Sequence, residues 1–444
     1  MKLPRWLRAY DAALALAGAA WLPYDLLIRR PGHPGLTQRF GYYPAAVQEA
    51  LCRGGRPVWV HAVSVGEALV ALTLLKALKA RCPKRQWVVS TTTPTGQRLV
   101  RERLPVEDTV LYAPWDLTPA VMRALAAIRP CAFLGLESEL WPNLLLRLGA
   151  AGVPIAVVNG RISERSFQRY SVVRRWLRSA LVQVQVWGMQ TPTDAQRVIA
   201  LGVDPGRVHV LGNLKADATP PALDEGHLRD LRHRFGLDGR APLWIAGSTH
   251  PREEAVILNA FRQVRMDHQV LRLLLAPRHP ERIRDVERAV RQAGLTARRR
   301  SQMTGEPWDE HTVVILDTLG ELSQVYALAD LVFVGGSLVP HGGHNLLEPA
   351  QLGRPILTGP HTHNVQSIAD LLRVAQGLAV VEDAEALAAR VRQWLAHPDL
   401  RRQVGERARA AVAAQTGSTA KTVDLLCDTL GPALLEQWQV AGGG

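Results

Sequence analysis

Acidic side chains follow two apolar runs in the first half of the chain, where parallel strands would place a reaction site. Glu67 ends the segment HAVSVGE, and Glu137 and Glu139 lie at the end of AFLGLESE. With no cation near it in the sequence, Glu67 is a candidate general base, a group that takes a proton from a reacting hydroxyl. An acid in the first turn of a helix also stabilises that helix, and the spacing does not separate the two interpretations. Glu137 and Glu139 either orient polar groups of a substrate or cap a helix.

Two cations stand at comparable places. Arg278 lies between Pro277 and Pro280, which restrict its backbone, and a guanidinium can bind two phosphate oxygens at once. We therefore expect Arg278 to contact an anion rather than to be a solvated surface charge. Lys215 follows the last strand expected in the first half, where its ammonium could reach a site, although such a lysine is usually only solvated.

The segment GSTHPREE places His250 at the end of another apolar run. Ser248 or Thr249 would be a suitable N-cap for a helix that begins at Pro251. Capping explains most of this segment and leaves His250 as a candidate anion contact.

The segment LVFVGGSLVPHGGHNLLEPA, residues 331–350, predicts a buried strand, a glycine-rich loop and a helix that starts at Asn345. A helix entered through glycines presents unpaired backbone N–H groups and the positive end of its dipole, which suits a phosphate or carboxylate. A second strand follows from Pro355, and ligands of such parallel units lie at the carboxyl ends of the strands. The segment therefore predicts an anion site.

Short β-rich runs alternate with amphipathic segments, which is typical of parallel sheets covered by helices. The first group of expected strands is 58–63, 87–92, 110–113, 132–137, 155–160, 186–190 and 208–213. After a proline-bearing polar linker at 216–226, a second group follows at 243–248, 271–277, 313–317, 331–336, 355–359 and 378–382. We expect an α/β protein with two doubly wound, Rossmann-like domains facing a cleft, at 31–215 and 227–444, the second ending in basic helices.

The totals fit a globular chain with an anionic partner. The chain has 444 residues, 47% of them hydrophobic, and a formal net charge of +13. It contains no GxxxxGK[ST] segment and no clean GxGxxG turn, which argues against P-loop and dinucleotide enzymes. The four cysteines show no metal spacing. With 6% aromatic residues and arginines mostly along helix faces, a nucleic-acid-binding protein is disfavoured.

Residues 1–30 form a segment of their own, with the uncharged run AALALAGAAWLPY between basic flanks. As a helix this run would be about 20 Å long, short of the roughly 30 Å hydrocarbon core of a bilayer. We expect an N-terminal membrane-associating helix that lies at the interface, with Trp21 and Tyr24 at the boundary and basic residues on anionic headgroups. A helix packed on its own domain is the alternative.

In sequence order, these segments resemble the 3-deoxy-D-manno-octulosonic acid (Kdo) transferases of lipopolysaccharide assembly. The matching motifs span nearly the whole chain: RFG, HAVSVGE, TTTPTGQ, LESELWPN, VNGRIS, LGNLK, GSTH, APRHPER, DTLGEL, GGSLVPHGGHNLLEPA and TGPHTHN. The resemblance implies a two-domain glycosyltransferase of the GT-B type that transfers Kdo from CMP-Kdo to a lipid A precursor (lipid IVA) with inversion at the anomeric carbon. It implies no required metal and no other cofactor.

The resemblance also implies roles for particular residues. Glu67 would be the proton acceptor, and Glu137 and Lys215 the transition-state stabilising positions, in the acceptor-binding domain. The segments that would bind CMP in the donor-binding domain are Pro277-Arg278, Leu319-Gly320-Glu321 and Asn345-Leu346-Leu347-Glu348. A phosphorylated lipid acceptor places such an enzyme on the anionic cytoplasmic face of the inner membrane, held as a monotopic protein or by a single N-terminal anchor. The nearest alternative is a GT-B transferase that uses a UDP-linked sugar on a membrane lipid.

Overall fold

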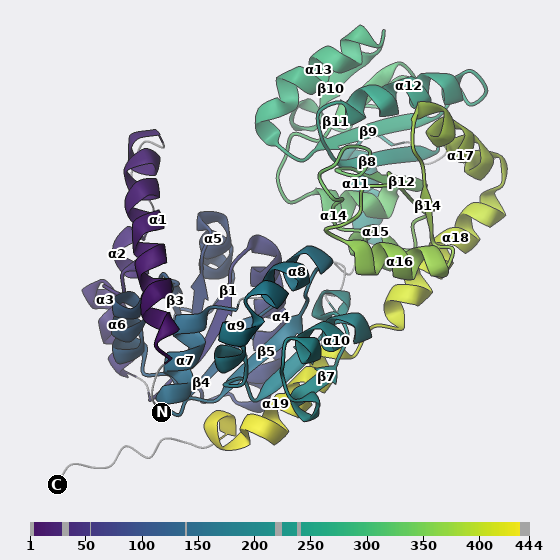
Figure 1. The fold of residues 1–444 in the computed structure, drawn as a ribbon. Coiled ribbons are helices and arrows are strands. Elements are labelled where there is room, and N and C mark those ends of the chain that lie inside the picture. Colours follow the sequence, from purple (N-terminus) through teal and green to yellow (C-terminus); the bar gives the residue numbers. More distant parts are fainter. Residues whose placement is uncertain are drawn as a thin grey trace. The chain divides into compact units, whose positions relative to one another are not determined.

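The computed structural model describes residues 4–28, 35–53, 55–137, 140–217, 224–237 and 241–435. The chain forms two compact units (Figure 1), the first made of residues 1–218 and 416–444 and the second of 219–415. Each unit contains one parallel sheet, so the expected pair of doubly wound domains is confirmed. Most of the expected linker, residues 218–223, lies outside the described residues.

The first unit contains a seven-stranded parallel sheet in the order β3-β2-β1-β4-β5-β6-β7. Its strands are β1 (Val58–Ala62), β2 (Trp87–Thr91), β3 (Thr109–Tyr112), β4 (Ala132–Leu136), β5 (Ile155–Gly160), β6 (Val186–Met189) and β7 (Val208–Val210). The connecting helices are α4 (Val65–Arg81), α5 (Pro94–Arg103), α6 (Thr118–Ile128), α7 (Pro142–Ala150), α8 (Glu164–Val172), α9 (Arg174–Leu181) and α10 (Pro192–Ala200). The strand order reverses between β1 and β4, which is where doubly wound sheets bind ligands.

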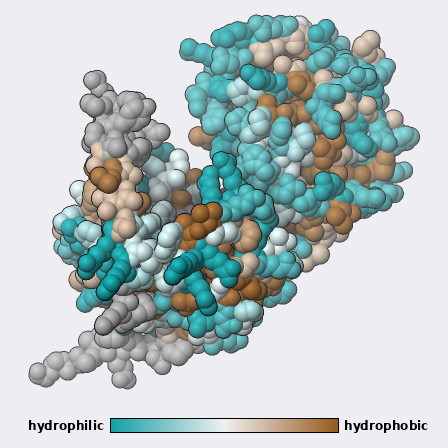
Figure 2. Space-filling model, in the orientation of Figure 1, coloured by the Kyte–Doolittle hydropathy of each residue, from teal (hydrophilic) through white to brown (hydrophobic). Residues whose placement is uncertain are grey.

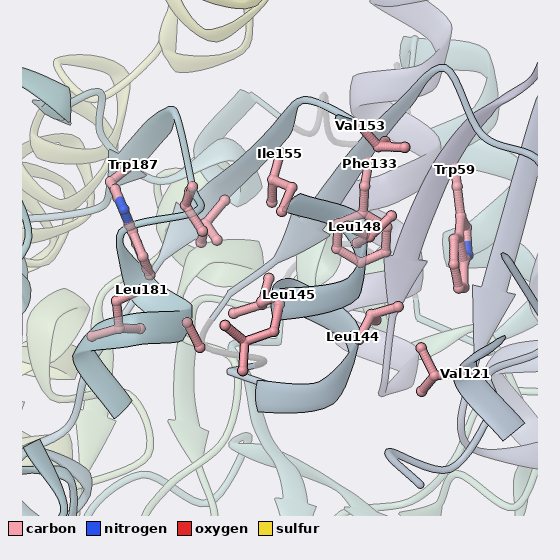
Figure 3. Close-up of a cluster of buried hydrophobic side chains, with 14 of the residues drawn as sticks. Trp59, Val121, Phe133, Leu144, Leu145, Leu148, Val153, Ile155, Leu181 and Trp187 are labelled. Carbon is pink, nitrogen blue, oxygen red and sulfur yellow. The ribbon is translucent and has the colours of Figure 1, made fainter. Parts of the chain in front are cut away.

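Both faces of this sheet are covered, as the continuous apolar strands predict. One core contains Trp59 and Phe133, whose rings meet edge to face at 5.1 Å, packed with side chains of α6, α7 and α9 (Figure 3). The other core joins Val60 and Leu134 to α4 and to the C-terminal helix α19 (Ser418–Leu435). The two buried faces hold the carboxyl ends of β1 and β4 at a fixed position.

Helix α19 lies in the first unit, although the sequence analysis assigned all of 227–444 to the second domain. The apolar side chains of α19 that belong to the core with α4 are Val423, Leu426, Leu430 and Leu434. The expectation was wrong here because an amphipathic pattern shows that a helix has an apolar face but not which sheet covers that face.

The second unit repeats the plan with the strand order β10-β11-β9-β8-β12-β13-β14. Its strands are β8 (Leu243–Thr249), β9 (Arg272–Pro277), β10 (Thr296–Arg299), β11 (Thr312–Ile315), β12 (Leu331–Val334), β13 (Ile356–Thr358) and β14 (Leu378–Val380). Its helices are α11 (Glu225–Arg234), α12 (Glu253–Arg265), α13 (Ile283–Gln292), α14 (Leu322–Val325), α15 (Leu347–Gln351), α16 (Gln366–Val374), α17 (Ala384–Ala396) and α18 (Pro398–Ala413). Here the order reverses between β8 and β12.

Strand β10 is the one strand of the described residues that the sequence analysis missed. Its sequence is TARR, which lacks the apolar pattern of a buried strand. It lies at the edge of the sheet, where Arg299 pairs with Glu287 at 2.7 Å and Arg298 pairs with Glu306. Charged residues on an edge strand prevent it from pairing with another chain. The sequence of such a strand therefore resembles that of a polar loop.

Three helices precede the first sheet: α1 (Trp6–Ile28), α2 (Leu36–Arg39) and α3 (Ala45–Arg53). The start of α1 is fixed to the first unit, since Leu7 is buried in its core and the hydroxyl of Tyr10 donates to Asp116 at 3.0 Å. Further along, α1 leaves the core, and Leu16 is 73% exposed. Among the described residues, the helices are all too short or too polar to cross a membrane.

Candidate functional site

Glu67 lies in the first turn of α4, directly beyond the carboxyl end of β1. Ser64 caps this helix by accepting from the backbone N–H of Glu67 at 3.3 Å. The Glu67 carboxylate in turn accepts from the Val63 N–H at 2.7 Å and from the Ser64 hydroxyl at 2.9 Å. This is a variant of the capping box, so the capping role considered for Glu67 is present.

The Glu67 carboxylate is nevertheless better suited to take a proton than an ordinary cap. The side chain is buried, and burial, with a smaller contribution from the charge of Glu137, raises its pKa above that of an ordinary glutamate. The bonds from Val63 and Ser64 and the charge of Lys215 oppose this shift of the pKa. A carboxylate has about four lone-pair positions, so two accepted hydrogen bonds leave room for a reacting hydroxyl.

Glu137 follows β4 and therefore lies beside Glu67, on the other side of the reversal of strand order. Its backbone has φ 56°, in the left-handed region, although it carries a side chain. A non-glycine residue held in this region costs on the order of 1 kcal/mol and often marks a functional site. Its neighbours Ser138 and Glu139 lie outside the described residues.

Lys215 is brought to the same place from β7. Its ammonium donates to the Glu137 carboxylate at 2.7 Å, and its backbone N–H is held by the Asn213 side chain at 3.0 Å. A Cβ added to Gly66 would lie 3.7 Å from the Lys215 ammonium nitrogen, so Lys215 also reaches the start of α4. The three residues that the resemblance groups as catalytic thus converge at one carboxyl edge, although they are up to 148 positions apart along the chain.

In the second unit, the glycine-rich loop after β12 differs from the expected anion cradle. Its backbone N–H groups at Gly336, Ser337 and Leu338 donate to the carboxylate of Glu253, at 2.7, 2.9 and 2.9 Å. The N–H of His250 donates to the same carboxylate at 2.9 Å. These four donors are satisfied within the protein, so they are not available to a bound phosphate.

Glu253 also corrects the expected start of the helix after β8. Helix α12 begins at Glu253, with Arg252 as its N-cap residue, rather than at Pro251 with Ser248 or Thr249 as N-cap. Glu253 is completely buried. The sequence analysis missed its role because its four donors come from two loops more than 80 residues apart, and a pattern of single residues carries no signal for this.

Four histidines gather where these two loops meet. The rings of His250 and His341 stack with centroids 4.1 Å apart, and His279 meets His250 edge to face at 5.6 Å. The Nε2 atoms of His250 and His344 lie 2.7 Å apart, a hydrogen bond in which one ring donates and the other accepts. Burial lowers the pKa of both His250 and His344 to about 4, assisted by the neighbouring rings and Arg282 at His250 and by Arg278 and the neighbouring rings at His344. At neutral pH these two rings are therefore hydrogen-bonding groups rather than cations.

Arg278 adds the positive charge that the imidazoles lack. It follows β9, its backbone N–H donates to Thr249 at 3.0 Å, and its side chain is exposed. Within the described ranges its guanidinium forms no ion pair, which leaves its donors free for an anion.

The remaining predicted residues lie in the same unit. Leu319 and Gly320 are exposed, and Glu321 accepts from Thr318 and pairs with Arg300 at 3.6 Å. The Asn345 side chain accepts from the Leu347 N–H at 3.0 Å and donates to Glu348 at 2.9 Å. Burial raises the pKa of Glu348. Leu346 and Leu347 are buried, and Pro277 ends β9. Helix α15 begins at Leu347 rather than at Asn345, where the sequence analysis expected it, and has only five residues.

No set of three or more His, Cys, Asp or Glu side chains in the described part of the chain is arranged to hold a metal ion.

Two family models match the chain, one in each half. Residues 34–218 match the family model described as 3-deoxy-D-manno-octulosonic-acid transferase (kdotransferase). Residues 255–411 match the model described as glycosyl transferases group 1.

Two relatives resemble the chain over most of its length. It is 36% identical to the 3-deoxy-D-manno-octulosonic acid transferase of Bordetella pertussis, covering 94% of this chain and 98% of the relative. It is 34% identical to the enzyme of the same name from Haemophilus influenzae, covering 88% and 90%. Among solved structures, a glycosyltransferase from Rickettsia africae superposes with a TM-score of 0.60 at 12% identity, covering 84% of this chain and 98% of that one. At that identity the likeness shows the fold alone.

Proposed function

The chain belongs to the 3-deoxy-D-manno-octulosonic acid (Kdo) transferase family, with the two-domain GT-B fold of a glycosyltransferase, and we propose that it transfers Kdo from CMP-Kdo to a hydroxyl of a lipid A precursor in lipopolysaccharide core biosynthesis. The observation that carries the proposal is the convergence of Glu67, Glu137 and Lys215 at the carboxyl edge between β1 and β4.

Inverting transfer is a single displacement, and Glu67 supplies the base that it needs. The acceptor hydroxyl gives its proton to the Glu67 carboxylate as its oxygen forms a bond to the anomeric carbon of Kdo. The bond from that carbon to the CMP phosphate oxygen breaks, and CMP leaves with the electron pair. A base placed in this way contributes about 10²- to 10⁴-fold to the rate.

Glu137 and Lys215 act as a charge pair beside the base. The Lys215 ammonium offsets negative charge that develops during the displacement, and Glu137 fixes that ammonium at 2.7 Å. Burial raises the pKa of Glu67, and the ammonium of Lys215, with the bonds from Val63 and Ser64, opposes that rise and so favours the ionised base.

The second unit holds the nucleotide of the donor. Arg278, whose guanidinium forms no ion pair within the described residues, binds the phosphate, and the His250–His344 pair leaves one neutral N–H, on the ring that accepts the bond between them, as a further donor. Leu319-Gly320-Glu321 and Asn345-Leu346-Leu347-Glu348 line the rest of the nucleotide site, and the Glu348 carboxylate accepts from ribose hydroxyls. The N–H groups of Gly336, Ser337 and Leu338 in the loop after β12 donate to Glu253. The phosphate is therefore bound mainly by side chains, and not by the backbone N–H groups of a glycine-rich loop.

Mass spectrometry of the lipid product tests this function directly. The protein is incubated with CMP-Kdo and a tetraacylated lipid A precursor, and we expect the lipid to gain the mass of one or more Kdo residues. The alternative, a UDP-linked donor, is tested by calorimetry: tighter binding of UDP than of CMP would contradict the Kdo assignment.

We further propose that the protein acts at the anionic cytoplasmic face of the inner membrane. Brown and tan atoms lie along the described part of α1 in Figure 2, where residues 12–19 are mostly exposed. Helices α8 and α9 supply a second surface, with Trp176 51% exposed beside Val172. The exposed arginines on these two helices are Arg165, Arg169, Arg174, Arg175 and Arg178. Exposed apolar side chains among cations suit an interface with anionic lipid.

Flotation with phosphatidylglycerol vesicles separates the two surfaces. Deletion of residues 1–30 and the triple change Arg169/Arg174/Arg175→Gln should each reduce the bound fraction. The matched control is Arg284/Arg288/Arg291→Gln on α13, which removes three exposed arginines from the second unit. If the control reduces binding as much as the α8–α9 change, net charge rather than this surface binds the membrane.

A further inference from the structure

The first unit contains a pocket that the catalytic residues do not use. It lies at the carboxyl edge of the sheet, where a cavity of about 50 Å³ opens into a wider space of about 420 Å³ that includes solvent. The side chains that define it are Arg39, Trp59, His61, Thr92, Trp115 and Trp141. Arg39 belongs to the RFG motif and Thr92 to TTTPTGQ, two of the family motifs without a role in the proposed chemistry.

Arg39 is a buried cation without a matching anion. It is 5% exposed, its Nη2 donates to the Thr92 carbonyl, and its guanidinium lies over the Tyr112 ring at 4.9 Å. Its Nε has no hydrogen-bond partner, and in the described residues its side chain forms no ion pair. A buried charge is expensive unless it is paired, so a position of this kind favours an anionic ligand.

The carboxylate that lines the same pocket is already occupied. Asp116 accepts from the backbone N–H groups of Asn143 at 3.0 Å and Leu144 at 2.8 Å, and from the Tyr10 hydroxyl at 3.0 Å. Asp116 therefore fastens α7 and α1 to the pocket wall, and three of its lone-pair positions are used there.

The walls suit a sugar. Trp115 and Trp141 line the pocket with side chains that keep accessible surface, and Trp115 is held edge to face against Phe40 at 4.8 Å, whereas the Trp59 ring is completely buried. Rigid aromatic surfaces with one well-placed charge are typical of sites that bind a ring with apolar C–H faces and a single anionic group. The combination matches a phosphorylated sugar better than a nucleobase or a free lipid chain.

The pocket lies near both Glu67 and the start of α1. Next to Thr92, the N–H of Thr93 donates to the Val63 carbonyl at 3.2 Å, and the N–H of Val63 donates to Glu67, so the wall connects to the base through Thr93 and Val63. On the opposite wall, the Tyr10–Asp116 bond places the pocket at the foot of α1, whose later residues are exposed and apolar.

We propose that this pocket binds the phosphorylated sugar headgroup of the acceptor, with Arg39 on its phosphate. The proposal rests on the proposed function, since it assumes a lipid acceptor with a phosphorylated glucosamine. It adds the place where that headgroup binds and the residue that distinguishes it from an unphosphorylated sugar.

Steady-state kinetics of Arg39→Gln test the proposal with the full-length protein. We expect the KM for the lipid acceptor to rise about tenfold or more, as expected for the loss of a charged hydrogen bond, with the KM for CMP-Kdo unchanged. The matched control is Arg123→Gln: Arg123 donates to Phe40 at 2.9 Å and lies over Tyr42 at 4.4 Å, but does not line the pocket. It should leave the acceptor KM unchanged.

Acceptor chemistry supplies the second arm. A dephosphorylated acceptor should raise the KM of the wild-type protein about as much as Arg39→Gln does, and should not raise the KM of Arg39→Gln further. If both proteins lose the same factor on dephosphorylation, Arg39 does not bind the phosphate. If Arg39→Gln raises the KM for CMP-Kdo instead, the pocket takes the carboxylate of the donor sugar, and the proposal is wrong.

Folding is controlled separately. Circular dichroism reports whether Arg39→Gln folds, and if it does not, Trp141→Ser replaces it, because Trp141 is 36% exposed and caps α7 only through its backbone. Trp141→Ser should raise the acceptor KM alone, and an unchanged acceptor KM overturns the proposal. Absence of any transfer by the wild-type protein would instead refute the proposed function itself.

Discussion

The two units have nearly the same sheet plan, but the carboxyl edges of their sheets are built in opposite ways. In the first unit, acids are presented at the edge: Glu67 caps a helix there, and Glu137 is paired with Lys215. In the second, the acid at the equivalent place, Glu253, is buried beneath the loops, and neutral histidines and Arg278 are presented above it. A doubly wound sheet therefore fixes where a site lies, whereas the loop residues decide whether acids or neutral histidines and an arginine line it.

The largest effect is expected when the carboxylate of Glu67 is removed and the second unit is left unchanged. Glu67→Gln preserves the side-chain shape but cannot accept a proton as a carboxylate does, so kcat should fall by about 10²- to 10⁴-fold. CMP affinity, measured by calorimetry, should stay within twofold of the wild type, about the error of the measurement. Turnover near the wild-type level would mean that another residue is the base. Thermal unfolding checks that the change has not simply destroyed the helix cap.

In the second unit, the corresponding change is made at the buried carboxylate of Glu253. In Glu253→Gln, an amide NH₂ faces backbone N–H donors that the carboxylate now satisfies, so we expect a loss of about 3 kcal/mol in the free energy of unfolding. Urea denaturation measures this loss, and CMP binding should weaken with it. Glu406→Gln, which changes an exposed glutamate on α18 of the same unit, is the control and should change neither quantity. If Glu253→Gln behaves like this control, the loop does not depend on the buried carboxylate.

Above that carboxylate, Arg278→Ala should weaken CMP binding about tenfold, since one charged contact to phosphate is lost. Arg291→Ala, an exposed arginine on α13, should not change CMP affinity. Equal CMP affinity of Arg278→Ala and the wild type would remove Arg278 from the anion site. In Arg278→Ala, kcat at saturating donor should change less than the KM for the donor. This pattern is the converse of the one expected for Glu67→Gln.

Backbone strain provides a finer test of the first edge. Glycine adopts φ 56° without the steric cost that Glu137 bears, so Glu137→Gly should lose activity while the free energy of unfolding stays equal or rises by about 0.5 kcal/mol. Glu137→Gln, which keeps the strain and loses the charge, is the matched control. A large loss of stability in Glu137→Gly would mean that the Lys215 pair, rather than function, retains the acid there.

The smallest expected effect is a shift in pH dependence. The base must be ionised to act, and burial raises the pKa of Glu67, so kcat/KM should fall as the pH drops through a midpoint above 4.5, the ordinary glutamate value. Ser64→Ala removes a hydrogen bond that lowers this pKa, and should move the midpoint further up. A pH profile recorded at low acceptor concentration measures both midpoints, and a downward shift would contradict the assignment.

The sequence predicted most of the fold because buried parallel strands have a continuous apolar signal. It missed β10, whose charged residues form ion pairs at the edge of the sheet. It also placed α19 in the wrong unit, since an amphipathic pattern does not show which sheet covers the apolar face of a helix. For the site, it named Glu67 and Lys215 as candidates from their places after strands, and the structure brings both to one edge of the sheet, but it did not reveal Glu253, whose role depends on backbone groups. Arg39 was visible only within a motif, because its isolation becomes apparent only once Tyr112 and Thr92 surround it.

The return of α19 to the first unit has a consequence for how the chain can be cut. The second unit both leaves and rejoins the first at one place, where Asp217 accepts from the N–H of Gly417 at 2.7 Å and from that of Thr419. In topological terms it is an insertion whose two ends are tied together. A fragment of residues 219–415 should therefore fold as a separate unit. A simple C-terminal truncation at 415 would instead remove an apolar cover from the unit that contains Glu67.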